Sequence, residues 1–373
     1  MNKKNNFLIA CIVYMATVLL LIAIRFCSGM GWLSNIPDEP LEVGFSIISQ
    51  VIIMFALPYF VYKIYDNKRK AKTEQETNEI IIEIKKTDAA FTDFGFRRIS
   101  WRFILMAFAL GFLLYIMNIF VGGVFYLILD DMGYRFSSNE QTFTGWGGLF
   151  ISLLLVCVLP GFCEEFSHRG LLLSGFQSKF SNYRAVMSVC ILFGLMHLNI
   201  EQVFYATILG WLICMAVLSS RSVWVGVIIH FTNNAISTYL SYADDLNLPG
   251  LGLIDALAGG GVLVVLLVLI LVFTGIGAIM KVMAKENFEK NKKVYVAKYI
   301  ALHSNDFSGV DFERVTSAVE RAIDTLPTWK AVFAYCETND KPQKLTPAER
   351  AVFTSLFVLG GLVTVFTFCW GML

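Results

Sequence analysis

The feature that most constrains this chain is a series of long apolar segments joined by polar connections. A helix needs roughly 20 apolar residues to cross the hydrocarbon core of a bilayer. Hydrophobic residues make up 56% of the 373 residues and charged residues 16%, a balance that excludes a soluble globular protein. We therefore expect an all-α, multi-pass transmembrane helical bundle. About nine spans are expected, at 7–25, 43–62, 103–129, 146–160 running on towards 176, 184–198, 202–219, 222–240, 252–280 and 351–372.

The basic residues are concentrated in two polar regions of the sequence. Ten Lys or Arg residues lie between Lys63 and Arg102, and twelve lie between Lys281 and Arg350. Basic loops stay on the cytoplasmic side of a membrane. We therefore predict that the N-terminus, residues 66–100 and residues 283–346 are cytoplasmic, and that the C-terminus lies outside.

These patterns divide the chain into six expected parts. They are two N-terminal transmembrane helices (1–65), a polar cytoplasmic linker (66–100), a transmembrane core (101–245), a transmembrane helix (246–282), a small cytoplasmic helical domain (283–346) and a C-terminal transmembrane helix (347–373). Within the cytoplasmic domain, the sequence DFERVTSAVERAIDTL has the apolar period of an amphipathic helix. Thr346, Pro347 and Glu349 read as a capping box that opens the last span.

Several ionisable residues lie inside the apolar segments, where a charged side chain costs about 2.5–3.5 kcal/mol or more. Residues four apart share one face of a helix, so Glu165 and Arg169 are expected to form an ion pair. Glu164 is rotated about 100° away from Glu165 and is free to project elsewhere. From the helix rise, Glu164, His197 and His230 are expected to converge in the cytoplasmic half of the bilayer.

Three short motifs carry these residues: EEFSHR, FGLMH and HFTNN. They resemble the EExxxR, FxxxH and HxxxN motifs of the CPBP intramembrane proteases, which include type II CAAX prenyl endopeptidases and bacteriocin-processing or immunity relatives. The resemblance covers about residues 95–240 and predicts that the core is the catalytic part of an intramembrane endopeptidase that cleaves near the cytoplasmic side.

The resemblance also implies a role for each residue. Glu164 is expected to be the general base that activates a water, with His197 helping to hold that water. His230 and Asn234 are expected to stabilise the oxyanion that forms when the water attacks. Glu165 and Arg169 are expected to be a structural pair that orients the first carboxylate.

One position departs from the family pattern, because His168 stands before the arginine where an aromatic residue is common. It lies four residues after Glu164, so it is read as a polar replacement at the helix flank or as a residue that tunes Glu164 or adds a ligand.

Other readings of the same residues stay open. Glu164, His197 and His230 could form a zinc site with two histidines and one carboxylate, although the sequence has neither HExxH nor HxxEH. A catalytically silent scaffold or immunity protein that binds a peptide is a second reading. A proton-coupled transporter is a third. The expected partners are the lipid bilayer and a peptide or membrane-protein substrate, with no nucleic acid; prenylated CAAX tails, leader peptides and membrane-protein segments are all compatible.

Overall fold

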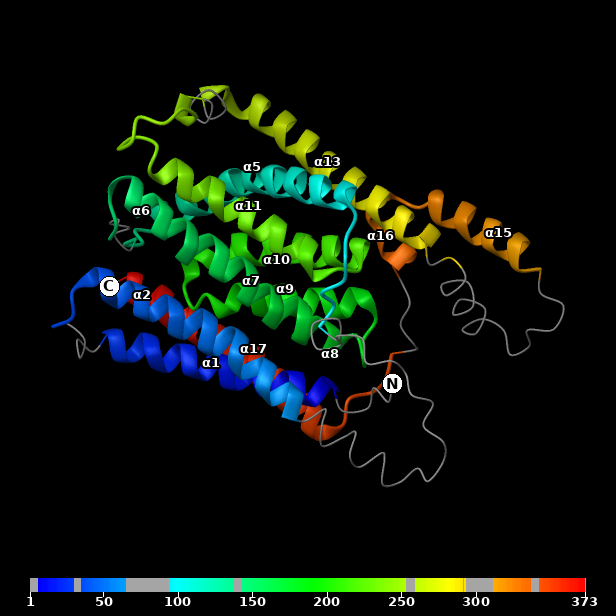
Figure 1. Cartoon of the computed structure of the whole chain (residues 1–373), viewed down its shortest axis with the longest axis horizontal. Coiled ribbons are helices and arrows are strands. Elements are labelled where there is room, and N and C mark those ends of the chain that lie inside the picture. The colour runs from blue at the N-terminus through cyan, green and yellow to red at the C-terminus, as the bar shows by residue number, and fades with distance from the viewer. Residues whose placement is uncertain are drawn as a thin grey trace.

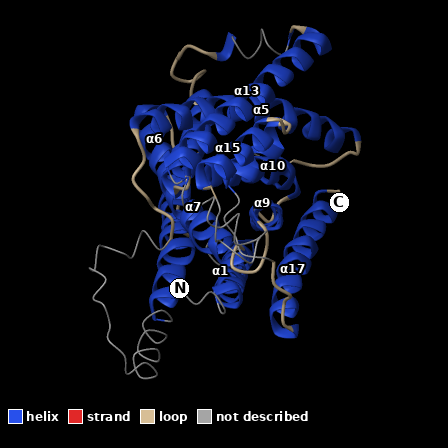
Figure 2. Ribbon diagram, turned by 90° about the vertical axis from the view of Figure 1, so that its right-hand side faces the viewer, coloured by secondary structure: helices blue, strands red, loops and turns tan. Residues whose placement is uncertain are grey.

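The computed structural model describes residues 6–29, 35–64, 94–136, 142–252, 259–290, 292, 311–336 and 342–372. Within those ranges every regular element is a helix (Figure 2), which confirms the expected all-α class. Seven helices in this part of the chain are long and apolar enough to cross a membrane. They span Phe7–Cys27, Asp38–Ile64, Trp101–Asp131, Gly145–Phe176, Ile200–Ser220, Gly261–Lys290 and Pro347–Gly371.

The two remaining expected spans are also helical, although neither is counted among the seven. One is α9 (Asn182–Met196), an apolar helix of 15 residues. The other is α11 (Val223–Ser241), which has 19 residues. A total of nine spans therefore remains a prediction. Most of the expected linker, 66–100, lies outside the described residues.

The centre of the bundle is α10 (Ile200–Ser220), which is 67% buried along its apolar window, whereas α13 (Gly261–Lys290) is 17% buried. Helices α5 (Trp101–Asp131), α9, α11 and α13 all pack against α10. A Cβ atom at Gly194 of α9 would lie 2.0 Å from Thr207 Oγ1 of α10. Glycine therefore permits the close crossing of α9 and α10, and this crossing fixes the end of α9 from which His197 projects.

Helices α1 (Asn6–Gly29) and α17 (Pro347–Gly371) lie side by side along one flank of the core (Figure 1). Phe7 of α1 stacks on Phe176 and Phe353, which belong to the fourth span and to α17. The predicted capping box opens α17, since Thr346 accepts from the Glu349 amide and the Glu349 carboxylate accepts from the Thr346 amide. The first and last helices of the chain therefore cover the same flank.

The second and fourth spans contain π-helical turns. The second span consists of α2 (Asp38–Ser46) and η1 (Ile47–Ala56) and continues to Ile64. The fourth span is divided into the following segments: α6 (Gly145–Ser152), η2 (Leu153–Val158), α7 (Leu159–Glu165), η3 (Phe166–Leu173) and α8 (Ser174–Phe176). Such turns inside α-helices are frequent at functional sites.

The expected cytoplasmic domain contains two short helices, α15 (Phe312–Asp324) and α16 (Thr328–Cys336). The first of these confirms the helix predicted from its apolar period. Asp324 accepts hydrogen bonds from Lys285 at 2.9 Å and from Tyr335 at 2.8 Å. These bonds, that from Lys285 first, hold the pKa of the Asp324 carboxyl below its usual value. They tie α15 and α16 to the end of α13.

The ends of the helices form two opposite faces of the bundle (Figure 1). One face carries the start of α1, the turn between α8 and α9, the turn between α10 and α11, and helices α15 and α16. We call it the basic face, because its two turns carry Lys179 and Arg221. The opposite face carries the ends of α5, α11 and α17, and we call it the acidic face. The side of the membrane on which each face lies stays a prediction.

Candidate active site

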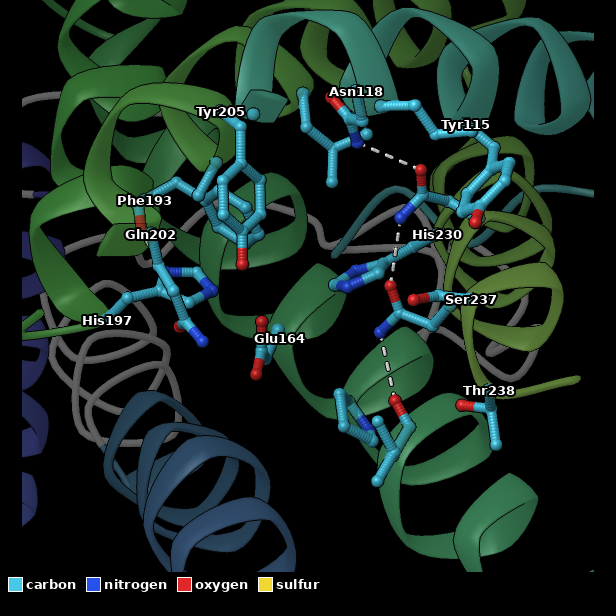
Figure 3. A pocket seen from close by; sticks show the side chains of 18 of the residues that line it. Tyr115, Asn118, Glu164, Phe193, His197, Gln202, Tyr205, His230, Ser237 and Thr238 are labelled. Atoms are coloured by element: carbon cyan, nitrogen blue, oxygen red, sulfur yellow. Dashed lines mark hydrogen bonds between the residues drawn. The ribbon is translucent and has the colours of Figure 1, made fainter. Parts of the chain in front are cut away.

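The motif residues line a pocket of about 630 Å³ between α5, α7, α10 and α11. Glu164, His197, His230 and Asn234 all contribute to its wall. Figure 3 shows the rings of His197 and His230 on either side of the Glu164 carboxylate. The structure therefore brings together the four residues that sequence analysis singled out as catalytic candidates.

Glu164 lies at the end of α7 and is 7% exposed. Its Oε1 accepts a hydrogen bond of 2.9 Å from Nε2 of Gln50, a residue of η1 in the second span. Sequence reasoning missed Gln50, whose only signal was a single amide inside the apolar run IISQVIIMFA. The bond fixes one oxygen of the carboxylate and leaves the other without a protein partner among the hydrogen bonds of the described residues.

Glu165 faces the opposite way and is buried with no exposed side-chain area. Its Oε1 accepts from Arg169 Nη1 at 2.7 Å and from His230 Nδ1 at 2.9 Å. The expected Glu165–Arg169 pair is present, but it contacts His230 rather than orienting Glu164. A Cβ atom at Gly226 of α11 would lie 2.7 Å from Glu165 Oε2, so glycine lets α11 approach the buried pair.

Arg169 is held on three sides. Besides Glu165, its Nη2 donates to the carbonyl of Gly210 at 3.0 Å. Its guanidinium lies 4.5 Å from the centroid of the Phe193 ring, a cation–π contact. The arginine therefore joins the fourth span to α9 and α10 next to the pocket, on its side nearest the basic face.

The hydrogen bonds of the two pocket histidines assign their ring orientation. His197 follows the end of α9, and its Nδ1 donates to the Phe193 carbonyl at 2.9 Å, because a carbonyl can only accept. The Nδ1 of His230 likewise donates to the Glu165 carboxylate. Each ring thereby turns its Nε2 towards the pocket and Glu164 (Figure 3).

A chain of three side-chain amides forms one wall of the pocket (Figure 3). Asn118 Nδ2 donates to Asn233 Oδ1 at 3.0 Å, and Asn233 Nδ2 donates to Asn234 Oδ1 at 3.1 Å. Asn234 Nδ2 donates to the Val156 carbonyl at 2.9 Å. Pro160 has no N–H to offer this carbonyl four residues earlier, so Asn234 supplies a donor. Sequence reasoning found Asn234 but missed Asn118 and Asn233.

His168 points away from the pocket and is fully buried. Its Nδ1 bonds to the Glu164 carbonyl at 2.8 Å, and its Nε2 bonds to the Tyr14 hydroxyl of α1 at 2.9 Å. The reading of His168 as an extra ligand does not fit this geometry. The residue instead joins the backbone at Glu164 to α1.

The residues do not fit a metal centre as they are arranged. Among the described residues, no three His, Cys, Asp or Glu side chains are grouped so that they could hold a metal ion. The zinc reading of Glu164, His197 and His230 is therefore not supported by this geometry.

Residues 146–236 match the family model described as type II CAAX prenyl endopeptidase Rce1-like. The core of the chain is therefore similar to this protease family. The matched segment runs from α6 to α11 and contains all three motifs. No curated protein and no solved structure gives a match. The seven long apolar helices of the described residues, together with this match, support an integral membrane protein.

Proposed function

We propose that the protein is an intramembrane endopeptidase in which Glu164 activates a water molecule. The observation that carries the proposal is the different surroundings of the two adjacent carboxylates. Glu165 is paired with Arg169 and His230. Glu164 lines the pocket, and within the described part of the chain its carboxylate is bonded to Gln50 alone. The Glu164 carboxylate can therefore take a proton from water, whereas the Glu165 carboxylate is bonded to buried partners.

The proposed reaction begins with a water held between Glu164 and Nε2 of His197. Glu164 takes one proton from this water, and the water oxygen attacks the peptide carbonyl carbon. The carbonyl π bond opens and its electrons move to the oxygen. The same proton is then delivered to the leaving nitrogen as the C–N bond breaks. The reaction thus consumes one water and one peptide bond and forms one carboxyl group and one amino group.

His230 and Asn234 are proposed to stabilise the oxyanion. Asn234 Nδ2 has a second N–H besides the one given to Val156. His230 Nδ1 donates to Glu165, so its ring is held with Nε2 towards the pocket, where that nitrogen can contact the oxyanion through a proton. The buried pair thus supports the pocket through His230.

The test measures cleavage of an internally quenched peptide library by the protein in proteoliposomes. Wild type should cleave some members, while Glu164→Gln, His197→Ala and His230→Ala should each lose activity by at least about 100-fold. Glu313→Gln, which changes an exposed carboxylate of α15 outside the matched motifs, is the control and should retain full activity. Undiminished cleavage by Glu164→Gln would refute the mechanism.

The same preparations separate this proposal from the metal-assisted alternative. Elemental analysis of the wild type should give no stoichiometric zinc. One zinc per chain that disappears in His197→Ala would overturn the glutamate mechanism in favour of a metal centre.

A further inference from the structure

The pocket runs towards one face of the bundle. Its wall on α5 extends from Tyr115 to Tyr126, and its wall on α11 extends from His230 to Thr238. Tyr126 lies five residues before the end of α5 and Thr238 three residues before the end of α11, or about 8 Å and 5 Å from those ends. Both helices end at the acidic face (Figure 1). The pocket therefore approaches that face.

The side of the site nearest the basic face is closed by packed side chains. Glu164 lies about 18 Å along the helix from Phe176, where the fourth span ends. The side chains in this layer are 0% exposed, and they come from η3, α8, α10 and α11: Phe166, Leu172, Phe176, Ile213 and Val225. His168 and Arg169 fill the space immediately beneath Glu164 and are 0% and 2% exposed. Access from the basic face is blocked by this layer.

The charges of the connections differ sharply between the two faces. Of the 30 Lys and Arg residues in the sequence, only Arg25 and Arg135 belong to segments next to the acidic face, and Arg169 is internal. The acidic face instead carries the pairs Asp130–Asp131 and Asp244–Asp245, next to the ends of α5 and α11. Such an excess of basic residues on one side places that side in the cytoplasm.

We infer that the pocket opens at the acidic face, outside the cytoplasm, and takes an uncharged, internal segment of a polypeptide presented from that side. The inference rests on the proposed endopeptidase function for the statement that the segment is cleaved. It replaces the expectation that cleavage takes place near the cytoplasmic side. That expectation rested on the depth of the motifs along their helices, which does not determine the side on which the pocket opens.

The lining of the pocket determines the class of segment. Apart from the two histidines, Glu164 is the only ionisable acid or base among the residues that line it, tyrosines aside. No Lys or Arg in the lining could pair with the carboxylate of a chain terminus, so an internal segment fits better than a C-terminal peptide. Cβ atoms added at Gly122 and Gly123 would meet nothing within 4 Å, so α5 leaves room for substrate side chains. The amide of Gln202 in the lining offers hydrogen bonds to an extended backbone.

The test is cysteine labelling of intact cells with a membrane-impermeant maleimide. The background carries Cys27→Ser and Cys369→Ser, since these are the two cysteines that are not buried. Ser237→Cys reports on the exposed α11 wall of the pocket, and Tyr126→Cys reports on the α5 wall in case the first variant fails to fold. Lys330→Cys on the exposed surface of α16 reports on the basic face.

The expected result is labelling of Ser237→Cys and Tyr126→Cys in intact cells, and labelling of Lys330→Cys only after the cells are permeabilised. Every other pattern overturns the inference, including pocket cysteines that react only after permeabilisation or react in neither state. Repeating the labelling with Glu164→Gln separates the two proposals, because access to the pocket does not require hydrolysis. The expected labelling together with an inactive wild type would overturn the endopeptidase and leave a pocket that binds a segment from outside.

Discussion

Removing each of the two adjacent carboxylates should lower cleavage, but only the loss of Glu165 should also lower the stability of the protein. We expect Glu164→Ala to abolish cleavage with little change in stability, because its side chain lines the pocket and has one hydrogen bond to Gln50. We expect Glu165→Ala to lower both stability and cleavage. That change leaves the Arg169 guanidinium buried without its carboxylate and deprives His230 of its acceptor.

The size of the effect follows from burial. Removing one partner of a buried ion pair costs about 3–5 kcal/mol, because the remaining charge is left uncompensated. Both side chains of the Glu165–Arg169 pair have no exposed area, so this range for a buried pair applies. Arg169 keeps its bond to the Gly210 carbonyl, which places the expected loss near 3 kcal/mol, the lower end of that range. The loss at Glu164 should stay near 1 kcal/mol.

The assay is reversible unfolding of the purified protein in mixed micelles, followed by helical circular dichroism, together with cleavage of the peptide library. The double variant Glu165→Ala, Arg169→Met is the control, since replacing both charges should recover most of the stability but not the activity. An Glu165→Ala protein that unfolds like the wild type and cleaves at the same rate would refute the role of the buried pair.

Two further predictions concern residues outside the motifs. Gln50→Leu should lower kcat/KM by about 10- to 100-fold, since a hydrogen bond to a charged group contributes about 1.5–3 kcal/mol; Ser49→Ala, which loses only a bond within its own helix, is the matched control. The pKa of Asp324 is lowered by hydrogen bonds from Lys285 and Tyr335, so it stabilises the docking of α15 above the unfolded-state pKa. That stability is lost as the pH falls through the folded-state pKa. The protection of the 312–336 amides, relative to their intrinsic exchange rates at each pH, should therefore fall on acidification, and Asp324→Asn should remove this pH dependence.

Features that depend on neighbouring positions along the chain could be predicted from the sequence. The helical class follows from apolar segment length, and the start of α17 follows from the spacing of Thr346 and Glu349. The Glu165–Arg169 pair follows from the four-residue period of a helix. In each case the interacting residues are close in the sequence, so a periodic pattern is sufficient.

Features that depend on packing between distant spans could not be predicted. Gln50 reaches Glu164 across 114 positions, and Tyr14 reaches His168 across 154. Both come from N-terminal helices outside the matched segment. The contact between Glu165 and His230 was missed for the same reason, because His230 lies on another helix. Which helices meet is decided by interhelical packing, and no local spacing encodes it.

The pairing of α1 with α17 has a consequence for how the protein is made. Helix α1 leaves the ribosome before α17, which covers it, so Phe7 meets Phe353 only after the segment between the two helices has been synthesised. Tyr14 of α1 bonds to His168, which in turn bonds to the backbone carbonyl of Glu164. A prematurely terminated chain therefore leaves α1 without its final neighbour, and it would display an unfinished flank to the quality-control proteases of the membrane.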